Sequence, residues 1–316
     1  MSTSHGHDDR HLDPPRVEEV ADRVFAYIQP DGSWMINNTG FLVARDGVSV
    51  IDACATERRT RAFLATIAGV TSAPVRTLVN THHHPDHTAG NGLFTGATIV
   101  AHENARPAMR ALGLPRNFGV FTDVDFGDLE LALPFLTFAD RLTLWADDLR
   151  CELLFAGGPA HTTNDIVVWI PERAVLFAGD LLFNGSTPFL LSGSVLGAID
   201  VLETFVRPLR AQTIVPGHGP VAGPGLVDEV LGYLRFVRDV AEQGRAAGVS
   251  PLELAQGTDL GRYTEWSDAE RIVGNLHRAY ADLARPAEER GRPIDAPGAL
   301  ADMVTYNGGR PLTCRA

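Results

Sequence analysis

The sequence predicts an α/β protein in which two mixed β-sheets pack face to face between outer helices, a four-layer αβ/βα sandwich with a C-terminal helical extension. Three observations favour this fold class. The stretch from Val17 to Cys54 alternates apolar and polar side chains, as strands do. Strand-like segments followed by helix-like segments then occur twice along the chain. After Gly225 the patterns are helical only.

The first half of the chain begins with a predicted β-meander, whose turns are expected at Asp31-Gly32 and Asp46-Gly47. A helix is predicted from Thr56 to Ile67, because its apolar residues share one side and Thr56 can cap its N-terminus. The remaining elements expected in this half are strands from Arg76 to Asn80 and from Thr98 to His102, and a short helix from Asn104 to Leu112.

The second half opens with a long segment from Gly113 to Pro134 that has no clear period. It is too long for an ordinary connection in a compact domain, so we expect it to form a wall of the active site. The elements predicted after it are strands at Arg141 to Trp145, Cys151 to Phe155, Asp165 to Ile170 and Ala174 to Ala178, a helix at Ile199 to Leu209 and a strand at Thr213 to Val215.

These elements divide the chain into three parts. Residues 1–16 are expected to be a disordered tail, residues 17–225 the sandwich with the catalytic site, and residues 226–316 a helical extension packed on it. The extension is predicted to contain helices from Val227 to Ala247 and from Ser267 to Ala284, followed by an irregular end rich in Pro and Gly.

The composition excludes several classes of function. The formal net charge of −12 would repel a phosphate backbone, so nucleic acid is not expected as a partner. All 27 basic residues are Arg, which rules out lysine-based chemistry such as Schiff bases. The three cysteines lack the paired spacing of a disulfide framework or a thiolate zinc site. The apolar runs are shorter than the roughly 18 residues of a membrane span and no secretory signal is visible, so we expect a cytoplasmic protein without a membrane partner.

A cluster of histidines and one aspartate follows a predicted strand. His82 and His84 are two residues apart, so in extended backbone both imidazoles point to one side and can share a metal ion. Asp86 and His87 lie just beyond the following turn, where they can face a second metal ion. His83 points to the opposite side by the same alternation, and we do not expect it to be a ligand.

The order H-x-H-x-D-H in a loop after a strand resembles the signature of the metallo-β-lactamase superfamily, and the other ligands of that family can be found in order. The histidine of its Gly-His-Thr loop matches His161, although Ala160 replaces the usual Gly. The aspartate of its strand-ending Gly-Asp pair matches Asp180. The histidine of its Pro-Gly-His-Gly turn matches His218, so every ligand position is filled.

The resemblance implies a dinuclear centre with two divalent metal ions, for which zinc is expected and iron or manganese are alternatives. It implies that His82, His84 and His161 hold one ion, that Asp86, His87 and His218 hold the other, and that Asp180 bridges them. The open coordination positions would share a hydroxide that attacks the substrate. It further implies that Asp52 supports the ligand loops and that Asp86 orients the hydroxide or moves its proton.

The identity of the bridging residue indicates which branches of the family the chain resembles. One β-lactam-degrading branch needs a cysteine where Asp180 stands and another has no bridging carboxylate, so the resemblance favours hydrolases of thioesters, lactones and phosphoesters, including the glyoxalase II type. The segments Gly32 to Phe41, Asp52 to Arg61 and Asp180 to Asn184 also resemble the actinobacterial aromatic polyketide cyclase/thioesterase subfamily, of the actinorhodin second-ring cyclase type. This resemblance implies ring closure and thioester cleavage on an intermediate bound to an acyl carrier protein.

Two alternatives remain open. The chain can be a lactonase or a thioesterase for small molecules, with the same metal site. It can also be a metal-binding scaffold that contacts other proteins without turnover, although seven intact ligands disfavour that interpretation. The sequence does not predict an oligomeric state.

A few residues outside the ligand set also carry predictions. Arg58, Arg59 and Arg61 form the densest basic group, which is either a solvated helix face or a contact for an acidic carrier protein. The residues assigned to the substrate cleft, with ordinary core packing as the alternative for the aromatic ones, are Trp34, Phe118, Phe121, Phe126 and Asn184. His5, His7 and His11 are assigned to the tail and not to the metal site.

Overall fold

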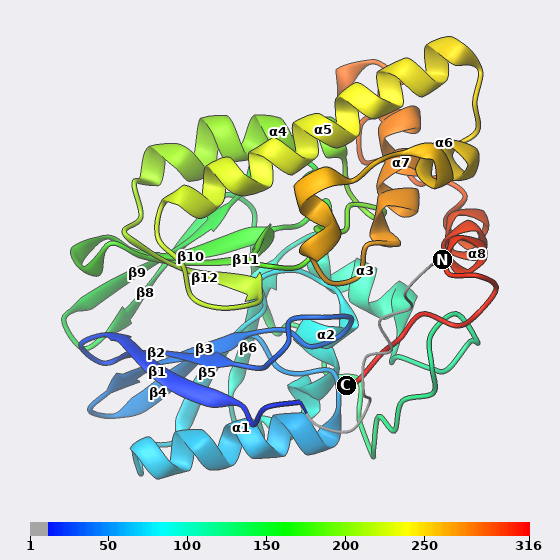
Figure 1. The fold of residues 1–316 in the computed structure, drawn as a ribbon. Helices are drawn as coiled ribbons and strands as arrows, with labels where there is room; N and C mark the ends of the chain where they lie inside the picture. The colour runs from blue at the N-terminus through cyan, green and yellow to red at the C-terminus, as the bar shows by residue number, and fades with distance from the viewer. Residues whose placement is uncertain (1–11) are drawn as a thin grey trace.

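The computed structural model describes residues 12–316 and shows two β-sheets packed face to face with helices on both outer sides (Figure 1). Helix α1 (Glu57–Val70) covers the first sheet, and helices α4 (Val195–Val201) and α5 (Gly225–Ala247) cover the second. The predicted α/β sandwich with a C-terminal helical region is therefore confirmed. His5, His7, His11 and most of the expected tail lie outside the described residues.

The first sheet has the strand order β1-β2-β3-β4-β5-β6-β7. Its first four strands are the predicted antiparallel meander, and its last four run parallel to one another. Strand β7 and the four-residue helix α2 were not predicted. The elements of this half are β1 (Arg16–Ala21), β2 (Val24–Ile28), β3 (Thr39–Ala44), β4 (Gly47–Ile51), β5 (Val75–Val79), α2 (Pro85–Thr88), β6 (Thr98–His102), α3 (Ala105–Leu112) and β7 (Leu136–Phe138).

The second sheet has the order β12-β11-β10-β9-β8, with only the pair of β11 and β12 parallel. Strand β11 extends five residues beyond the predicted end at Ala178, because the Gly-Asp pair that interrupts the apolar pattern is itself buried in the sheet. The helix predicted from Ile199 begins earlier, at Val195, and continues through a π-helical turn at Leu202–Val206. The strands are β8 (Arg141–Ala146), β9 (Leu149–Phe155), β10 (Ile166–Ile170), β11 (Val175–Phe183) and β12 (Thr213–His218).

Alternation of side chains along the strands separates the layers. In β10, Ile166, Val168 and Ile170 are buried between the two sheets, whereas Val167 and Trp169 belong to the core beneath α4 and α5. All five face apolar surroundings, which explains why this strand is a continuous apolar run in the sequence. The distance between the sheets is set by close contacts of this inner layer.

One such contact joins Gly40 of β3 to Phe177 of β11. A Cβ atom at Gly40 would clash with the ring of Phe177, so glycine is required for the two sheets to approach at this point. Phe177 is 3% exposed and belongs to the inter-sheet core. The contact therefore couples the positions of the two sheets, each of which carries part of the site described below.

The C-terminal helices contain more structure than the sequence predicted. Helix α7 (Arg271–Leu283) lies within the predicted range, whereas α6 (Pro251–Gly257) was not predicted and α8 (Ala296–Tyr306) lies in the end rich in Pro and Gly. Both of these helices begin with Pro in the first turn after a Ser or Asp cap, a pattern that favours helix starts. None of the helices in the described part of the chain is long and apolar enough to cross a membrane.

We predict that Phe177→Ala lowers the free energy of unfolding by about 3–5 kcal/mol, the range for removing a buried aromatic ring from a core. Denaturant unfolding monitored by circular dichroism measures the change. Trp145→Ala serves as the control, because Trp145 is 60% exposed and its loss should change stability by no more than about 0.5 kcal/mol. Equal effects of the two substitutions would contradict the packing described here.

Candidate metal centre

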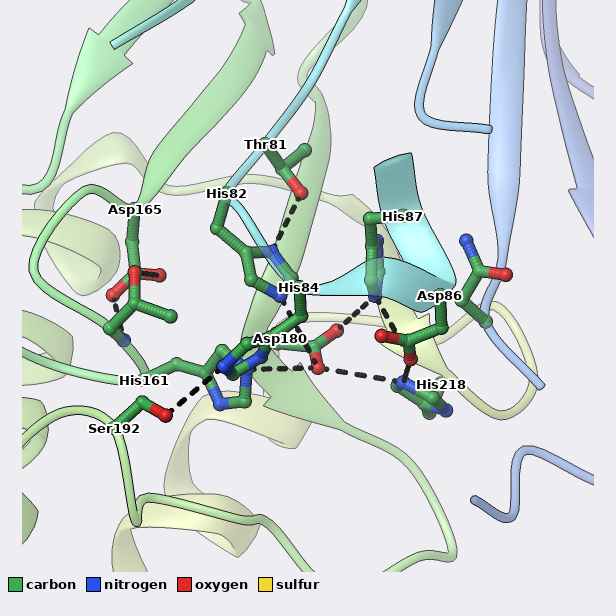
Figure 2. A network of polar contacts seen from close by, with 12 residues as sticks. Thr81, His82, His84, Asp86, His87, His161, Asp165, Asp180, Ser192 and His218 are labelled. Atoms are coloured by element: carbon green, nitrogen blue, oxygen red, sulfur yellow. Dashed lines mark hydrogen bonds and ion pairs between the residues drawn. The ribbon is translucent and has the colours of Figure 1, made fainter. Parts of the chain in front are cut away.

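The seven predicted ligands meet at one edge of the sandwich, where loops leave the strands of both sheets. His82, His84, Asp86 and His87 lie in and after the loop that follows β5 of the first sheet. From the second sheet, His161 comes from the loop after β9, Asp180 from the middle of β11 and His218 from the end of β12. Figure 2 shows these side chains pointing toward a common centre.

The ligand atoms form two groups that share one carboxylate. One group is His82, His84, His161 and Asp180, and the other is Asp86, His87, Asp180 and His218, with the atoms of each group within 4.8 Å of one another. These are the two sets expected from the sequence. Such sets of imidazole and carboxylate ligands suit divalent transition metals.

Asp180 lies between the two groups. Its Oδ1 atom is 3.0 Å from Nε2 of His87, and its Oδ2 atom is 3.2 Å from Nε2 of His161 and 3.4 Å from Nε2 of His218. Glycine at position 217 makes room for this carboxylate, because a Cβ there would clash with it. One carboxylate thus faces both groups of histidines, as a bridging ligand requires.

Unpartnered polar atoms test whether metal ions fit here. Nε2 of His82 is buried without a hydrogen-bond partner, and Nε2 of His87 and Oδ1 of Asp180 face each other at 3.0 Å without the geometry of a hydrogen bond. Nδ1 of His84 and Nε2 of His161 also face each other at 2.7 Å. A buried polar atom without a partner costs about 1–3 kcal/mol, so a concentration of them at one point requires a compensating ligand. Divalent cations bound between these atoms would satisfy them.

Hydrogen bonds to the ring nitrogens that face away from the centre fix the orientation of the histidines. Asp52 accepts from Nδ1 of His87 at 2.8 Å and from both the amide and the hydroxyl of Thr81 at 2.7 Å. The Thr81 hydroxyl in turn lies 3.1 Å from Nδ1 of His82. A histidine that donates through Nδ1 keeps the lone pair of Nε2 for a metal ion. One buried carboxylate therefore orients ligands of both groups.

Two further contacts orient ligands from more distant segments. Oγ of Ser192 lies 3.2 Å from Nε2 of His84, on the side of the ring away from the metal-facing Nδ1. The carbonyl oxygen of Gly32 lies 3.1 Å from Nδ1 of His218. His83 belongs to neither ligand group, and its Nδ1 lies 3.0 Å from the side-chain amide nitrogen of Asn164.

The electrostatics of the centre favour cation binding. Burial opposes the charge on Asp180, but the nearby His87 and His218 outweigh it and hold the pKa of this carboxyl well below its usual range. Burial lowers the pKa of His82 and the pKa of His84 well below that of a free imidazole. At His87 and His218 the carboxylates of Asp180 and Asp86 outweigh burial, raising the pKa of His87 well above that of a free imidazole and the pKa of His218 to about 9. In the metal-free protein the centre thus combines an ionised carboxylate with neutral and protonated imidazoles, and metal binding would displace the protons of His87 and His218.

An apolar cavity of about 120 Å³ opens beside the ligands. Trp34 and Phe121 line it, as expected, and their rings meet edge to face with centroids 5.0 Å apart. The lining residues that the sequence did not indicate are Met35, Pro85, Phe183, Phe189 and Arg271. Arg271 comes from α7, and its guanidinium lies 4.0 Å from the centroid of the Trp34 ring.

The other three residues assigned to the cleft lie elsewhere. The Phe118 side chain is 78% exposed on the long segment after α3. Phe126 packs against the core beneath the same segment. The Asn184 amide donates to the carbonyl of Pro220 at 2.9 Å and therefore serves the turn after His218. The segment from Gly113 to Pro134 does border the cavity, but through Phe121 alone.

Asp165 is another residue that the sequence did not indicate. It accepts hydrogen bonds from the amide and hydroxyl of Thr162 at 2.7 and 2.6 Å, which fixes the turn just after His161 (Figure 2). Burial raises the pKa of Asp165 to about 7. Neither Asp165 nor Ser192 has a sequence signal, because each stands in a loop where Asp and Ser are common.

We predict that Asp52→Asn weakens zinc binding by about 10- to 100-fold, the range for losing a partner behind a metal-binding histidine. The Asn amide would present an N–H group to Nδ1 of His87 and so favour the ring form that carries its proton on Nε2. Competition with a chelator measures the affinity. Asp302→Asn is the matched control, because Asp302 accepts from His277 at 2.8 Å far from the ligands, and this change should leave zinc affinity unaltered.

Comparison with known proteins agrees with this geometry. The chain is 23% identical over 226 residues to a type 2 metallo-beta-lactamase of Bacteroides fragilis, an alignment that covers 67% of this chain and 82% of the relative. It is 33% identical over 141 residues to a hydroxyacylglutathione hydrolase of Rhodospirillum rubrum, covering 44% of this chain and 45% of the relative.

Solved structures show the same fold. A metallo-beta-lactamase from Pontibacter korlensis superposes with a TM-score of 0.59 and 21% identity, covering 70% of this chain and 99% of that one. The family model of the metallo-beta-lactamase superfamily matches residues 32–218, a range that includes all seven candidate ligands. Because this match spans more than half of the chain and the ligands of the family converge in the structure, the chain belongs to the metallo-beta-lactamase superfamily.

Proposed function

We propose that the chain is a dinuclear metal-dependent thioester hydrolase, and that its substrate is an aromatic polyketide intermediate bound to an acyl carrier protein, released with ring closure. The observation that carries the thioesterase assignment is the placement of Asp180 between the two ligand groups. A carboxylate in this position favours the thioester, lactone and phosphoester hydrolases of the family over its β-lactam-degrading branches. The hydroxyacylglutathione hydrolase relative supports the same choice, since an acyl group on a thiol is a thioester.

The reaction needs a nucleophile, a polarised carbonyl and a proton acceptor. Two bound divalent ions, for which zinc is our proposal, would supply Lewis acidity and lower the pKa of water to about 7. Asp86 would orient the attacking water or take its proton, because its carboxylate lines the cavity beside His218, with Oδ2 3.2 Å from Nε2 of that histidine. The leaving thiolate is stable in water, so no strong general acid is required.

The cavity supports an apolar acyl group. Its walls are mainly aromatic and exclude water from the reacting carbonyl. Its volume of about 120 Å³ is smaller than the roughly 300–1,000 Å³ of most ligand pockets, so only the reacting end of a polycyclic substrate would enter. The remainder would lie along the segment from Gly113 to Pro134.

The arginines of α1 differ in their availability to a carrier protein. Arg59 donates to the side chain of Gln29 and to the carbonyl of Arg315, both at 2.9 Å, so it holds the chain end against α1. Arg61 is paired with Glu57 at 2.8 Å. Arg58 is exposed and borders a groove, which leaves it as the arginine of this group that suits an acidic partner.

A lactonase or a thioesterase for small molecules is the second candidate. The small size of the cavity favours it, because a compact acyl group would be enclosed completely. A non-catalytic scaffold is less well supported, since an open cavity beside the ligands has no purpose in a protein that only holds metal.

We predict that the purified protein contains up to two zinc ions and loses hydrolytic activity on chelation. Asp180→Ala should lower turnover at least about 10- to 100-fold and leave the three-histidine group better occupied than the other. Elemental analysis and turnover of a generic thioester measure both effects. Full activity in metal-free protein would exclude the proposal, whereas bound metal without any turnover would favour the scaffold.

We also predict that a carrier-bound aromatic polyketide thioester has a higher kcat/KM than a simple lactone or a β-lactam. Arg58→Glu should raise KM for the carrier-bound substrate at low salt and lose this effect at high salt, while hydrolysis of a small free thioester stays unchanged. A preference for the lactone would promote the second candidate. Equal effects of Arg58→Glu on both thioesters would show that the arginine does not contact a carrier.

A further inference from the structure

Helix α7 carries an unusual set of buried polar residues. Arg271, Asn275, Arg278 and Asp282 are each at most 2% exposed, and their spacing of four, three and four residues places them on one face of the helix. Burying charged and amide groups costs free energy unless they are paired and hydrogen-bonded. Their partners therefore indicate what this face of the helix does.

Three of the four have partners in one segment, residues 187–196, which we call the site loop, whereas Arg278 donates to the carbonyl of Arg292 and to Asp282. Arg271 donates to the carbonyl of Thr187 at 2.7 Å. Asn275 donates to the carbonyl of Pro188 at 2.7 Å and accepts from the amide of Leu190 at 2.9 Å. At the far end of the helix, Asp282 accepts from the hydroxyl of Ser194 at 2.9 Å.

Internal ion pairs complete this arrangement. Arg278 donates to Asp282 at 3.0 Å, and Arg271 pairs with Asp268 at 2.7 Å, so neither buried charge is left without a counter-ion. The face of α7 is thus a row of directional hydrogen bonds that follows the backbone of the site loop from end to end. An apolar face would bury the loop without fixing its register.

The site loop touches the metal centre at three points. Ser192 lies behind His84, with Oγ 3.2 Å from Nε2 (Figure 2). The amide of Ser194 donates to the carbonyl of Ala160 at 2.8 Å, which holds the turn that carries His161. The ring of Phe189 packs edge to face on Trp34, with centroids 4.9 Å apart, and lines the cavity. Any shift of the loop would therefore move two ligands and one wall together.

We infer that α7 is a positioning element of the active site: its polar face holds the site loop so that Ser192 orients His84 and Phe189 closes the cavity. The helix lies outside residues 32–218, the range matched by the family model, so this role is not supplied by the part of the chain that carries the ligands. The inference rests on the proposed metal centre but not on the identity of the substrate.

The test uses the full chain with Zn²⁺ and Co²⁺ as probes. Asn275→Leu removes both hydrogen bonds to the site loop, together with the one to the hydroxyl of Tyr233, at nearly constant volume, and Ser192→Ala removes the contact with His84 alone. Each change should weaken binding of one of the two ions about 10- to 100-fold and alter the visible absorption spectrum of the cobalt protein. His277→Ala is the control on the same helix, because His277 contacts Asp302 and not the loop, and it should change neither.

The double variant distinguishes positioning from loss of stability. Because Asn275 acts on His84 through Ser192 and on His161 through Ser194, Asn275→Leu should weaken metal binding less in protein that already carries Ser192→Ala than in wild-type protein. Thermal unfolding of metal-free protein identifies variants that fail to fold, and Asn275→Asp, which keeps the acceptor for Leu190, should then recover part of the affinity. Unchanged metal affinity in folded Asn275→Leu, or additive effects in the double variant, would overturn the inference. Wild-type protein without bound metal would instead refute the proposed function.

Discussion

The burial of Asp180 among four histidines is the constraint on which the rest of the structure depends. Its carboxylate is 6% exposed and lies within 4 Å of His82, His87, His161 and His218. An ionised carboxylate in such a place is costly unless positive charge balances it, and without metal that charge comes from protonated His87 and His218. Bound metal ions would supply that positive charge, but only if each ligand is held at a fixed distance. Hydrogen bonds accordingly hold the loops around the centre at several points.

Some of these hydrogen bonds join one sheet to the other. The amide of Ile166 in the second sheet donates to the carbonyl of Thr81 in the first at 2.8 Å, and the amide of Asn38 donates to the carbonyl of Gly217 at 2.6 Å. Asp52, at the end of β4, then fixes the orientation of His87 directly and of His82 through Thr81. Because each sheet supplies part of the ligand set, the distances between the ligands depend on how the two sheets pack against each other.

Four of the seven expected ligands follow from local spacing, whereas His161, Asp180 and His218 were expected from the resemblance to the metallo-β-lactamase superfamily. His82, His84, Asp86 and His87 lie within six residues, and the meander, the first helix and the strands follow from alternation and capping. Other contributions depend on contacts between segments far apart in the chain. Ser192 and Arg271 belong to ordinary loop and helix sequences, and only the fold brings them to the centre. Phe118 and Asn184 were misplaced for the same reason, since proximity to a motif in sequence does not determine the direction of a side chain.

The C-terminal region supports a site whose ligands it does not supply. Every ligand comes from residues 82–218, and of the residues that line the cavity only Arg271 comes from the helices that follow. Helix α7 holds Phe189 through the site loop and places Arg271 against Trp34. The backbone of Leu312 pairs with the segment around Phe121. The amide of Thr122 donates to the carbonyl of Leu312 at 2.9 Å, and the amide of Leu312 donates to the carbonyl of Val120 at 2.8 Å. Because α7 holds a loop that contacts His84 as well as one wall of the cavity, the C-terminal region shapes the cavity and the metal centre together.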